Sequence, residues 1–99
     1  MVYKIIIKKR FGNKLEHVLK YIEDEFGLLI AQKFADQLQQ KFHTLQHQPF
    51  IGRQSPTFSQ IRSIPLEKQN RIYYRIQKDK IIIINMYDTR INPKRNKLE

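Results

Sequence analysis

Apolar residues recur at helical intervals in two stretches of the chain. The first stretch predicts a helix with Asn13 as its N-cap, Glu16 three positions later at the capping-box spacing, and Gly27 at its end. The second predicts a helix that starts near Leu28 and ends before Pro49. The short connection between them favours an antiparallel helical hairpin. The two apolar stripes are Leu15, Val18, Leu19, Ile22 and Phe26, and then Ala31, Phe34, Leu38, Phe42 and Leu45.

Four other stretches carry β-branched or alternating patterns that are typical of strands. They are residues 2–8, 58–64, 70–77 and 80–87. Residues 48–57 contain two prolines and a glycine and predict a loop. Residues 81–84 are apolar on both faces, as in a central strand that is covered on each side. The order β-α-α-β-β-β predicts an α+β fold in which a helical hairpin packs on a small antiparallel sheet. We expect one domain over residues 1–99, with residues 89–99 as a basic C-terminal tail.

The charge balance narrows the choice of partners. Nineteen Lys and Arg residues against nine Asp and Glu residues give a net charge of +10 on 99 residues. Such a chain attracts nucleic acid or an acidic protein, and 99 residues exclude a multidomain enzyme. Cysteine is absent, which excludes disulfides and thiolate metal sites. Since no stretch approaches the roughly 18 apolar residues that span a bilayer, we expect a cytoplasmic protein without a membrane partner.

The strand predicted over residues 70–77 carries the main candidate chemistry. Alternation places Arg71, Tyr73 and Arg75 on one face, and the neighbouring strand and the end of the last strand add Arg62 and Arg90. Guanidinium groups bind phosphate oxygens and stabilise charge that develops at phosphorus, and aromatic rings stack on unpaired bases. An ordinary solvated sheet face is the alternative interpretation.

Basic residues also gather at both ends of the chain. Lys94 and Arg95 lie in the C-terminal group, which with Tyr73 and Arg75 is a candidate for binding nucleic acid. A solubilising surface is the alternative. His43 and His47 stand four residues apart, a spacing that suits a metal on a helix, but no third ligand accompanies them. We therefore expect no metal and no cofactor.

Several motifs together resemble the RelE/ParE superfamily of toxins from type II toxin–antitoxin systems, which includes proteins described as plasmid-stabilisation proteins. The resemblance covers nearly the whole chain. The motifs are Pro49-Phe50-Ile51-Gly52-Arg53, Ile61-Arg62, Asn70-Arg71-Ile72-Tyr73-Tyr74-Arg75-Ile76 and Tyr87-Asp88-Thr89-Arg90-Ile91-Asn92-Pro93.

The resemblance implies a basic toxin that a cognate antitoxin neutralises through an acidic, amphipathic C-terminal segment. RelE-like members cleave mRNA on the ribosome without a metal, and their pattern would make Arg62, Arg71 and Arg90 catalytic. Their C-terminal tyrosine is replaced near Asn96, which leaves Tyr87 as the candidate proton carrier. ParE-like members share the fold, lack this catalytic set and inhibit DNA gyrase. We expect growth inhibition by ribosome-associated mRNA cleavage, with gyrase inhibition as the alternative, so whether the chain is an enzyme stays open. A non-toxic basic module that binds nucleic acid is the hypothesis from another class.

Overall fold

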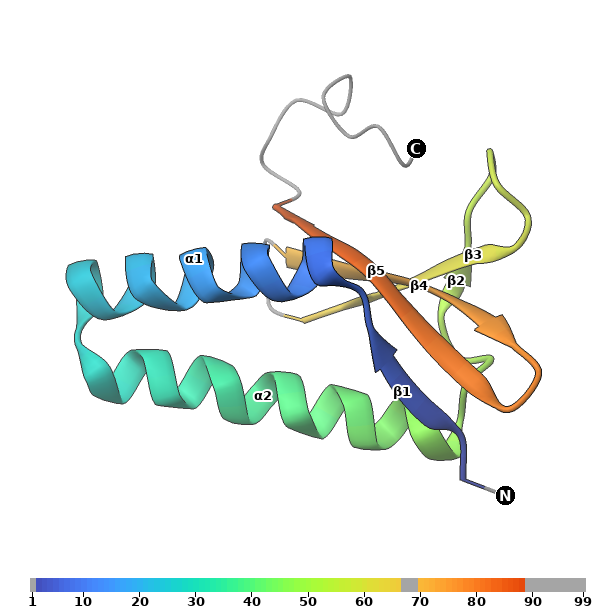
Figure 1. The fold of residues 1–99 in the computed structure, drawn as a ribbon, viewed down its shortest axis with the longest axis horizontal. Coiled ribbons are helices and arrows are strands. Elements are labelled where there is room, and N and C mark those ends of the chain that lie inside the picture. The colour runs from blue at the N-terminus through green and yellow to red at the C-terminus, as the bar shows by residue number, and fades with distance from the viewer. Residues whose placement is uncertain (1, 67–69, 89–99) are drawn as a thin grey trace.

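Two long helices and five strands make up the described part of the chain (Figure 1). The computed structural model describes residues 2–66 and 70–88. Its elements are β1 (Lys4–Ile7), α1 (Lys9–Phe26), α2 (Leu28–His47), β2 (Arg53–Gln54), β3 (Ile61–Pro65), β4 (Asn70–Gln77) and β5 (Lys80–Asp88). The predicted β-α-α-β-β-β order is confirmed, and the short β2 is added inside the loop predicted over residues 48–57.

The five strands form one sheet in the order β1-β5-β4-β3-β2. The predicted antiparallel meander is confirmed for β3, β4 and β5, and β2 pairs antiparallel with β3. In contrast, β1 pairs in parallel with β5, so the sheet is mixed. Parallel neighbours need a long connection between them, and here both helices and three strands separate β1 from β5 in the sequence. The buried β5 is an inner strand, as its apolar run predicts.

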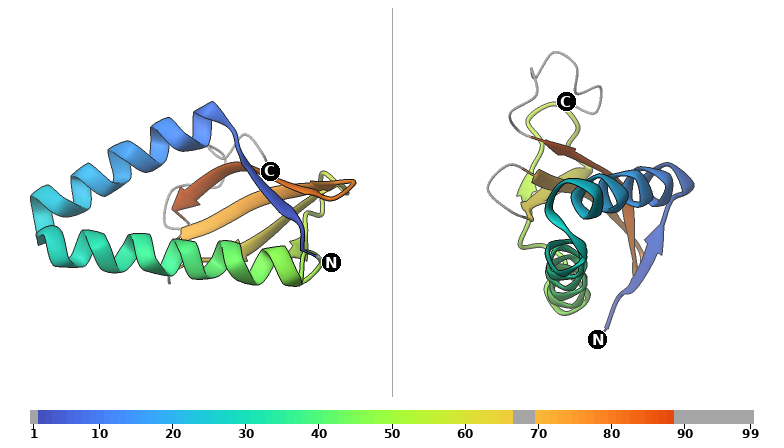
Figure 2. Two further views of the ribbon diagram at one scale, coloured as in Figure 1. Left: turned by 60° about the horizontal axis from the view of Figure 1, so that its bottom comes forward. Right: turned by 90° about the vertical axis from the view of Figure 1, so that its left-hand side faces the viewer.

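The helical hairpin packs on one face of this sheet, which we call the core face, and its far end extends beyond the strands (Figures 1 and 2). Neither described helix combines the length and the apolarity that crossing a membrane requires. The fully buried side chains of the core come from α1, α2, β4 and β5. They are Phe11, Leu45, Ile72, Tyr74, Ile81, Ile83 and Met86.

The first helix begins earlier than the sequence predicts. Its N-cap is Lys8, without a side-chain hydrogen bond, so the predicted N-cap at Asn13 is wrong. The earlier start is explained by a tertiary contact. Phe11 is completely buried, and the centroid of its ring lies 6.3 Å from that of Phe42 in α2. The helix therefore has to include Phe11, because burial of a large aromatic side chain outweighs the roughly 1 kcal/mol of a good N-cap.

The break between the helices falls at Gly27, as predicted. Its φ of 96° and ψ of 166° lie in a region that is essentially restricted to glycine. Its backbone N–H donates to the carbonyl of Glu23, and its own carbonyl accepts from the N–H of Ala31. One residue thus ends α1 and starts α2, which keeps the connection short.

Tyr74 fastens the loop after α2 to the core face. Its hydroxyl donates to the carbonyl oxygen of Pro49 at 2.7 Å and accepts from the N–H of Gly52 at 3.0 Å. A Cβ atom at position 52 would lie 2.8 Å from the Tyr74 ring, so the approach requires glycine. Burial raises the pKa of the Tyr74 phenol above its usual 10.0, which keeps the hydroxyl available as a donor.

We expect Tyr74→Phe to lower the free energy of unfolding by about 2 kcal/mol, because it leaves the Gly52 N–H and the Pro49 carbonyl without this partner. Urea unfolding measures the change, with Tyr21→Phe as the control because Tyr21 is exposed. The raised pKa means that the native state holds the phenolic proton more tightly than the unfolded chain. This part of the stability is therefore lost as the pH rises past about 10, and the Phe variant lacks that loss. Equal unfolding curves for the two variants at neutral pH would contradict the role given to the hydroxyl.

Candidate functional site

The face of β4 that points away from the helices carries two arginines and a tyrosine. On this outer face, Arg71, Tyr73 and Arg75 alternate with Ile72 and Tyr74, which belong to the core. The predicted row is therefore present. The two arginines are half-buried, but Tyr73 is only 5% exposed. Its ring is covered, whereas stacking on an unpaired base requires an open ring face.

A β-bulge in β5 determines which of its side chains lie on the outer face beside this row. The register pairs Tyr73 with Asn85 and Tyr74 with Ile83, so Ile84 has no partner in β4. An extra residue in one strand reverses the alternation of every residue that follows it. Asn85 therefore lies on the outer face beside Tyr73, whereas unbroken alternation from Ile83 would send it into the core.

The same reversal brings Tyr87 to the outer face, where three side chains surround it. Its hydroxyl accepts a hydrogen bond from Nδ2 of Asn85 at 3.2 Å. Its ring meets the ring of Tyr73 edge-on, with centroids 5.7 Å apart and planes at 75°. From α1, Nζ of Lys14 lies 4.2 Å from the centroid of the Tyr87 ring, a cation–π contact.

Arg71 is held next to Tyr87, its partner across the β4–β5 ladder. The guanidinium donates from Nε and Nη2 to Oγ of Ser63, at 3.2 and 3.1 Å, and from Nη2 to the Ser63 carbonyl at 3.2 Å. These bonds orient the planar group relative to the sheet. We call these residues the outer-face cluster: Lys14, Ser63, Arg71, Tyr73, Asn85 and Tyr87.

Arg62 does not belong to this cluster. It pairs with Tyr74 across the β3–β4 ladder, which places it on the opposite face from Arg71, so the expected convergence of the two arginines is wrong. Its Nη1 donates to the carbonyl oxygens of Gly52 at 2.9 Å and Phe50 at 3.3 Å, and its guanidinium carbon lies 5.3 Å from the centre of the Phe50 ring. The register sets this outcome, because residues of adjacent strands share a face only when they are paired or two apart.

Two cations, Lys14 and Arg71, flank the Tyr87 phenol. Burial lowers the pKa of Lys14 below its ordinary 10.5, because a partly dehydrated ammonium is less stable. This geometry suits an anion, since an ammonium and a guanidinium on one surface can both donate to the oxygens of a phosphate or a carboxylate. The other predicted site residues, Arg90, Lys94 and Arg95, lie outside the described residues.

Three members of the cluster escaped the sequence analysis. Asn85 and Ser63 are polar residues inside apolar strand patterns, and both are buried. A polar residue at a buried strand position is the signal that identifies them, because burial requires a hydrogen-bond partner. Lys14 stands beside the apolar stripe of α1 and gives no comparable signal.

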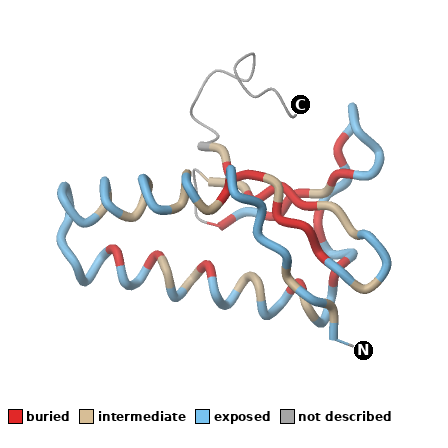
Figure 3. The backbone as a smooth tube through the Cα atoms, in the orientation of Figure 1, coloured by how far each residue is buried: buried red, intermediate tan, exposed pale blue. Residues whose placement is uncertain are grey.

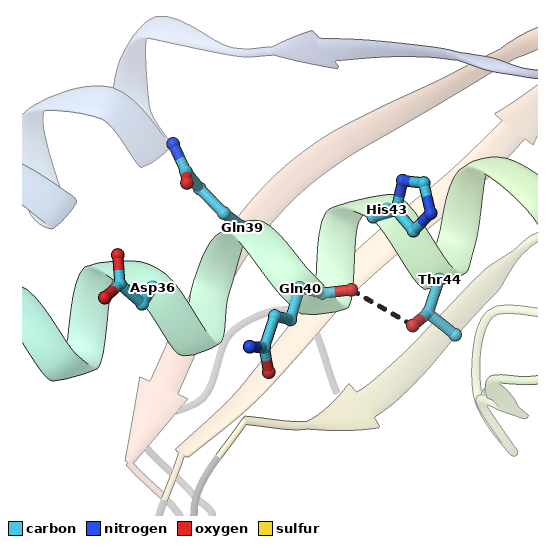
Figure 4. Close-up of a pocket in the computed structure, with 5 residues that line it drawn as sticks. All are labelled: Asp36, Gln39, Gln40, His43 and Thr44. Carbon is cyan, nitrogen blue, oxygen red and sulfur yellow. Dashed lines mark hydrogen bonds between the residues drawn. The ribbon is translucent and has the colours of Figure 1, made fainter.

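A separate shallow groove runs along α2. It is lined by Asp36, Gln39, Gln40, His43 and Thr44, and the Thr44 hydroxyl donates to the Gln40 carbonyl at 3.0 Å (Figure 4). The rings of the two candidate metal ligands, His43 and His47, lie 4.6 Å apart. Within residues 2–66 and 70–88, no group of three or more His, Cys, Asp or Glu side chains is arranged to hold a metal. The groove contains no residue of the outer-face cluster.

Comparison with known proteins connects this architecture to one family. Residues 5–92 match the family model described as the ParE toxin of the type II toxin–antitoxin system parDE. A chromosomal ParDE toxin–antitoxin system from P. aeruginosa contains a similar structure, with a TM-score of 0.74 and 17% identity over 88% of this chain and 96% of that chain. A YoeB/ParE toxin from Agrobacterium tumefaciens has a TM-score of 0.64 and 11% identity over 86% and 97% of the two chains. At these identities the structures show a shared fold. The curated proteins include no match.

The contacts of Tyr87 predict unequal effects for two substitutions. Tyr87→Phe keeps both ring contacts and loses the hydrogen bond from Asn85, so we expect it to lower the free energy of unfolding by about 1 kcal/mol. Tyr87→Ala also removes the contacts with Tyr73 and Lys14 and should cost about 2–3 kcal/mol. Urea unfolding of the two variants tests the difference. Equal losses would show that the hydroxyl alone matters and that the ring contacts contribute nothing measurable.

Proposed function

Because the chain belongs to the ParE toxin family of type II toxin–antitoxin systems, we propose that it arrests growth in the cytoplasm by binding DNA gyrase. Its natural partner is a cognate antitoxin. Membership of a toxin family favours this function over that of a non-toxic module that binds nucleic acid. In this mechanism the toxin acts by occupying its target and not by cutting RNA.

The placement of Arg62 carries this proposal. The RelE-like ribonuclease pattern would place Arg62 and Arg71 in one catalytic set, but the two lie on opposite faces of the sheet. Arg62 is engaged with the carbonyls of Phe50 and Gly52, where it supports the loop that Tyr74 also holds. In addition, the six residues of the outer-face cluster include neither a carboxylate nor an imidazole, the usual general bases at neutral pH. Binding without chemistry fits these residues better than RNA cleavage does.

The outer-face cluster has a role in this proposal as the surface that the antitoxin covers. An acidic, amphipathic segment would place its carboxylates near Lys14 and Arg71 and its apolar side chains over the sheet. Complementary charge accelerates such an association and stabilises it. The antitoxin therefore neutralises the toxin by occupying its basic face.

Purified toxin is expected to inhibit the supercoiling of relaxed plasmid by gyrase in a dose-dependent way. Gel electrophoresis of the plasmid gives the readout, and addition of the antitoxin should restore supercoiling. Relaxation by a type I topoisomerase serves as the control, because a DNA-coating basic protein would block both enzymes. Undiminished supercoiling at a large molar excess of folded toxin would rule out gyrase as the target.

One observation favours a second function, ribosome-dependent mRNA cleavage. Lys14, Arg71 and Tyr87 lie together, and the pKa of Lys14 is lowered by burial. When a ribose 2′ hydroxyl attacks the phosphate, it loses its proton to a water molecule and the bond from phosphorus to the 5′ oxygen breaks. An ammonium with a lowered pKa is a better proton donor to that leaving 5′ oxygen. The adjacent guanidinium of Arg71 would then stabilise the charge on the phosphate oxygens.

Toeprinting on programmed ribosomes separates the two functions. If the chain cleaves mRNA, wild-type toxin should create new ends in the A-site codon, and Lys14→Met should reduce their rate of formation by about 100-fold or more. The methionine keeps the length and packing of the lysine stem, so its unfolding curve should stay close to that of the wild type. Intact mRNA under conditions in which a RelE-like enzyme cuts would eliminate this second function.

A further inference from the structure

The far end of the helical hairpin exposes a group of large apolar side chains. We define the hairpin tip as residues 21–30, which join the end of α1 to the start of α2. Five large apolar side chains of the tip are between 47% and 79% exposed. The tip is mostly pale blue, the colour of exposed residues, in Figure 3. They are Tyr21, Phe26, Leu28, Leu29 and Ile30.

The apolar side chains of the tip are not needed to build the core of the folded domain. The tip lies beyond the sheet (Figures 1 and 2), and the one buried side chain of α1 is Phe11, at the opposite end of the helix. The rings of Tyr21 and Phe26 meet edge-on, with centroids 6.5 Å apart. Beside them, Ile22, Phe26, Ile30 and Phe34 line a hollow of about 220 Å³. Contiguous exposed apolar surface of this kind typically marks a protein interface.

The charge of the tip is opposite to that of the rest of the chain. Three of the nine acidic residues, Glu23, Asp24 and Glu25, lie within residues 21–30, which contain no Lys or Arg. These carboxylates occupy the last turn of α1, where the helix dipole makes negative charge unfavourable. The sequence therefore places acids where they weaken the helix, in a protein whose net charge is +10.

The exposed apolar side chains and the three carboxylates together indicate which kind of partner can bind the tip. An acidic antitoxin segment is attracted to Lys14 and Arg71 on the outer face and repelled by the tip. A symmetric contact between the tips of two copies would bring two sets of three carboxylates together. What fits the tip is a protein surface with apolar side chains at its centre and Lys or Arg at its rim.

We propose that the hairpin tip is the surface with which the toxin docks on gyrase, at an apolar patch of the enzyme that is bordered by basic residues. The inference rests on the function proposed above. Phe26 and Leu29 are the anchors, because they are the most exposed of the five apolar side chains, and the three carboxylates bind the basic rim. Antitoxin and target then bind different surfaces of the toxin, one basic and one acidic.

The test compares supercoiling inhibition by wild-type toxin with that by the double variant Phe26→Ser, Leu29→Ser. Loss of two apolar anchors should raise the concentration for half-inhibition at least about tenfold. The matched control is Val2→Ser, Ile7→Ser, which removes two exposed apolar side chains outside the tip and should inhibit like the wild type. Circular dichroism and urea unfolding confirm that each protein is folded.

A second variant, Glu23→Gln, Asp24→Asn, Glu25→Gln, keeps the test decisive if the serine variant does not fold. Neutralising these side chains removes their unfavourable interaction with the helix dipole, so the variant should be at least as stable as the wild type while inhibiting several-fold more weakly. Inhibition by a folded tip variant at the wild-type concentration would overturn this inference and leave gyrase as the target. Failure of the wild type to inhibit would instead overturn the proposed function, and this inference with it.

Discussion

The extra residue in β5 is the constraint on which both faces of the sheet depend. β5 lies between β1 and β4, and its pairing with β4 skips Ile84. Before the bulge, Ile81 and Ile83 face the helices, and after it Met86 does. If β5 had no bulge and Ile84 paired with Tyr73, Met86 would leave the core and Tyr87 would enter it. A single irregularity thus keeps the core apolar and gives the outer face its polar cluster.

Residues of the same type have different roles on the two faces of the sheet. Tyr74 and Arg62 are paired on the core face and hold the loop after α2 through backbone carbonyls. Tyr73, which precedes Tyr74 in the sequence, and Arg71 belong to the outer face with Tyr87. Residue type alone therefore does not separate an arginine that supports a loop from one that can meet a partner. The register of the strands, which places each side chain on one face of the sheet, makes that distinction.

Charge is distributed unevenly along the molecule, and this distribution gives the family membership a physical interpretation. The outer-face cluster contains the basic side chains of Lys14, from α1, and Arg71, from β4, while the hairpin tip is acidic and apolar. A toxin has to bind both the antitoxin that restrains it and the target that it attacks. In the functions proposed above, two surfaces of opposite charge would let these two partners be recognised by different chemistry, so that neither surface would have to fit both.

The sequence by itself determined the helices, the break at Gly27, the three strands of the meander and the alternation that sets Arg71 apart from Ile72. These features follow from the periodicity of apolar residues and from backbone preferences, and both can be read within one short segment of the chain. The tertiary structure alone decided that α1 starts before Phe11, that β1 joins β5 in parallel, that Arg62 faces the core and that Tyr87 does not. Each of these depends on pairing or burial against residues far away in the chain, and the register between two strands is set by both of them together.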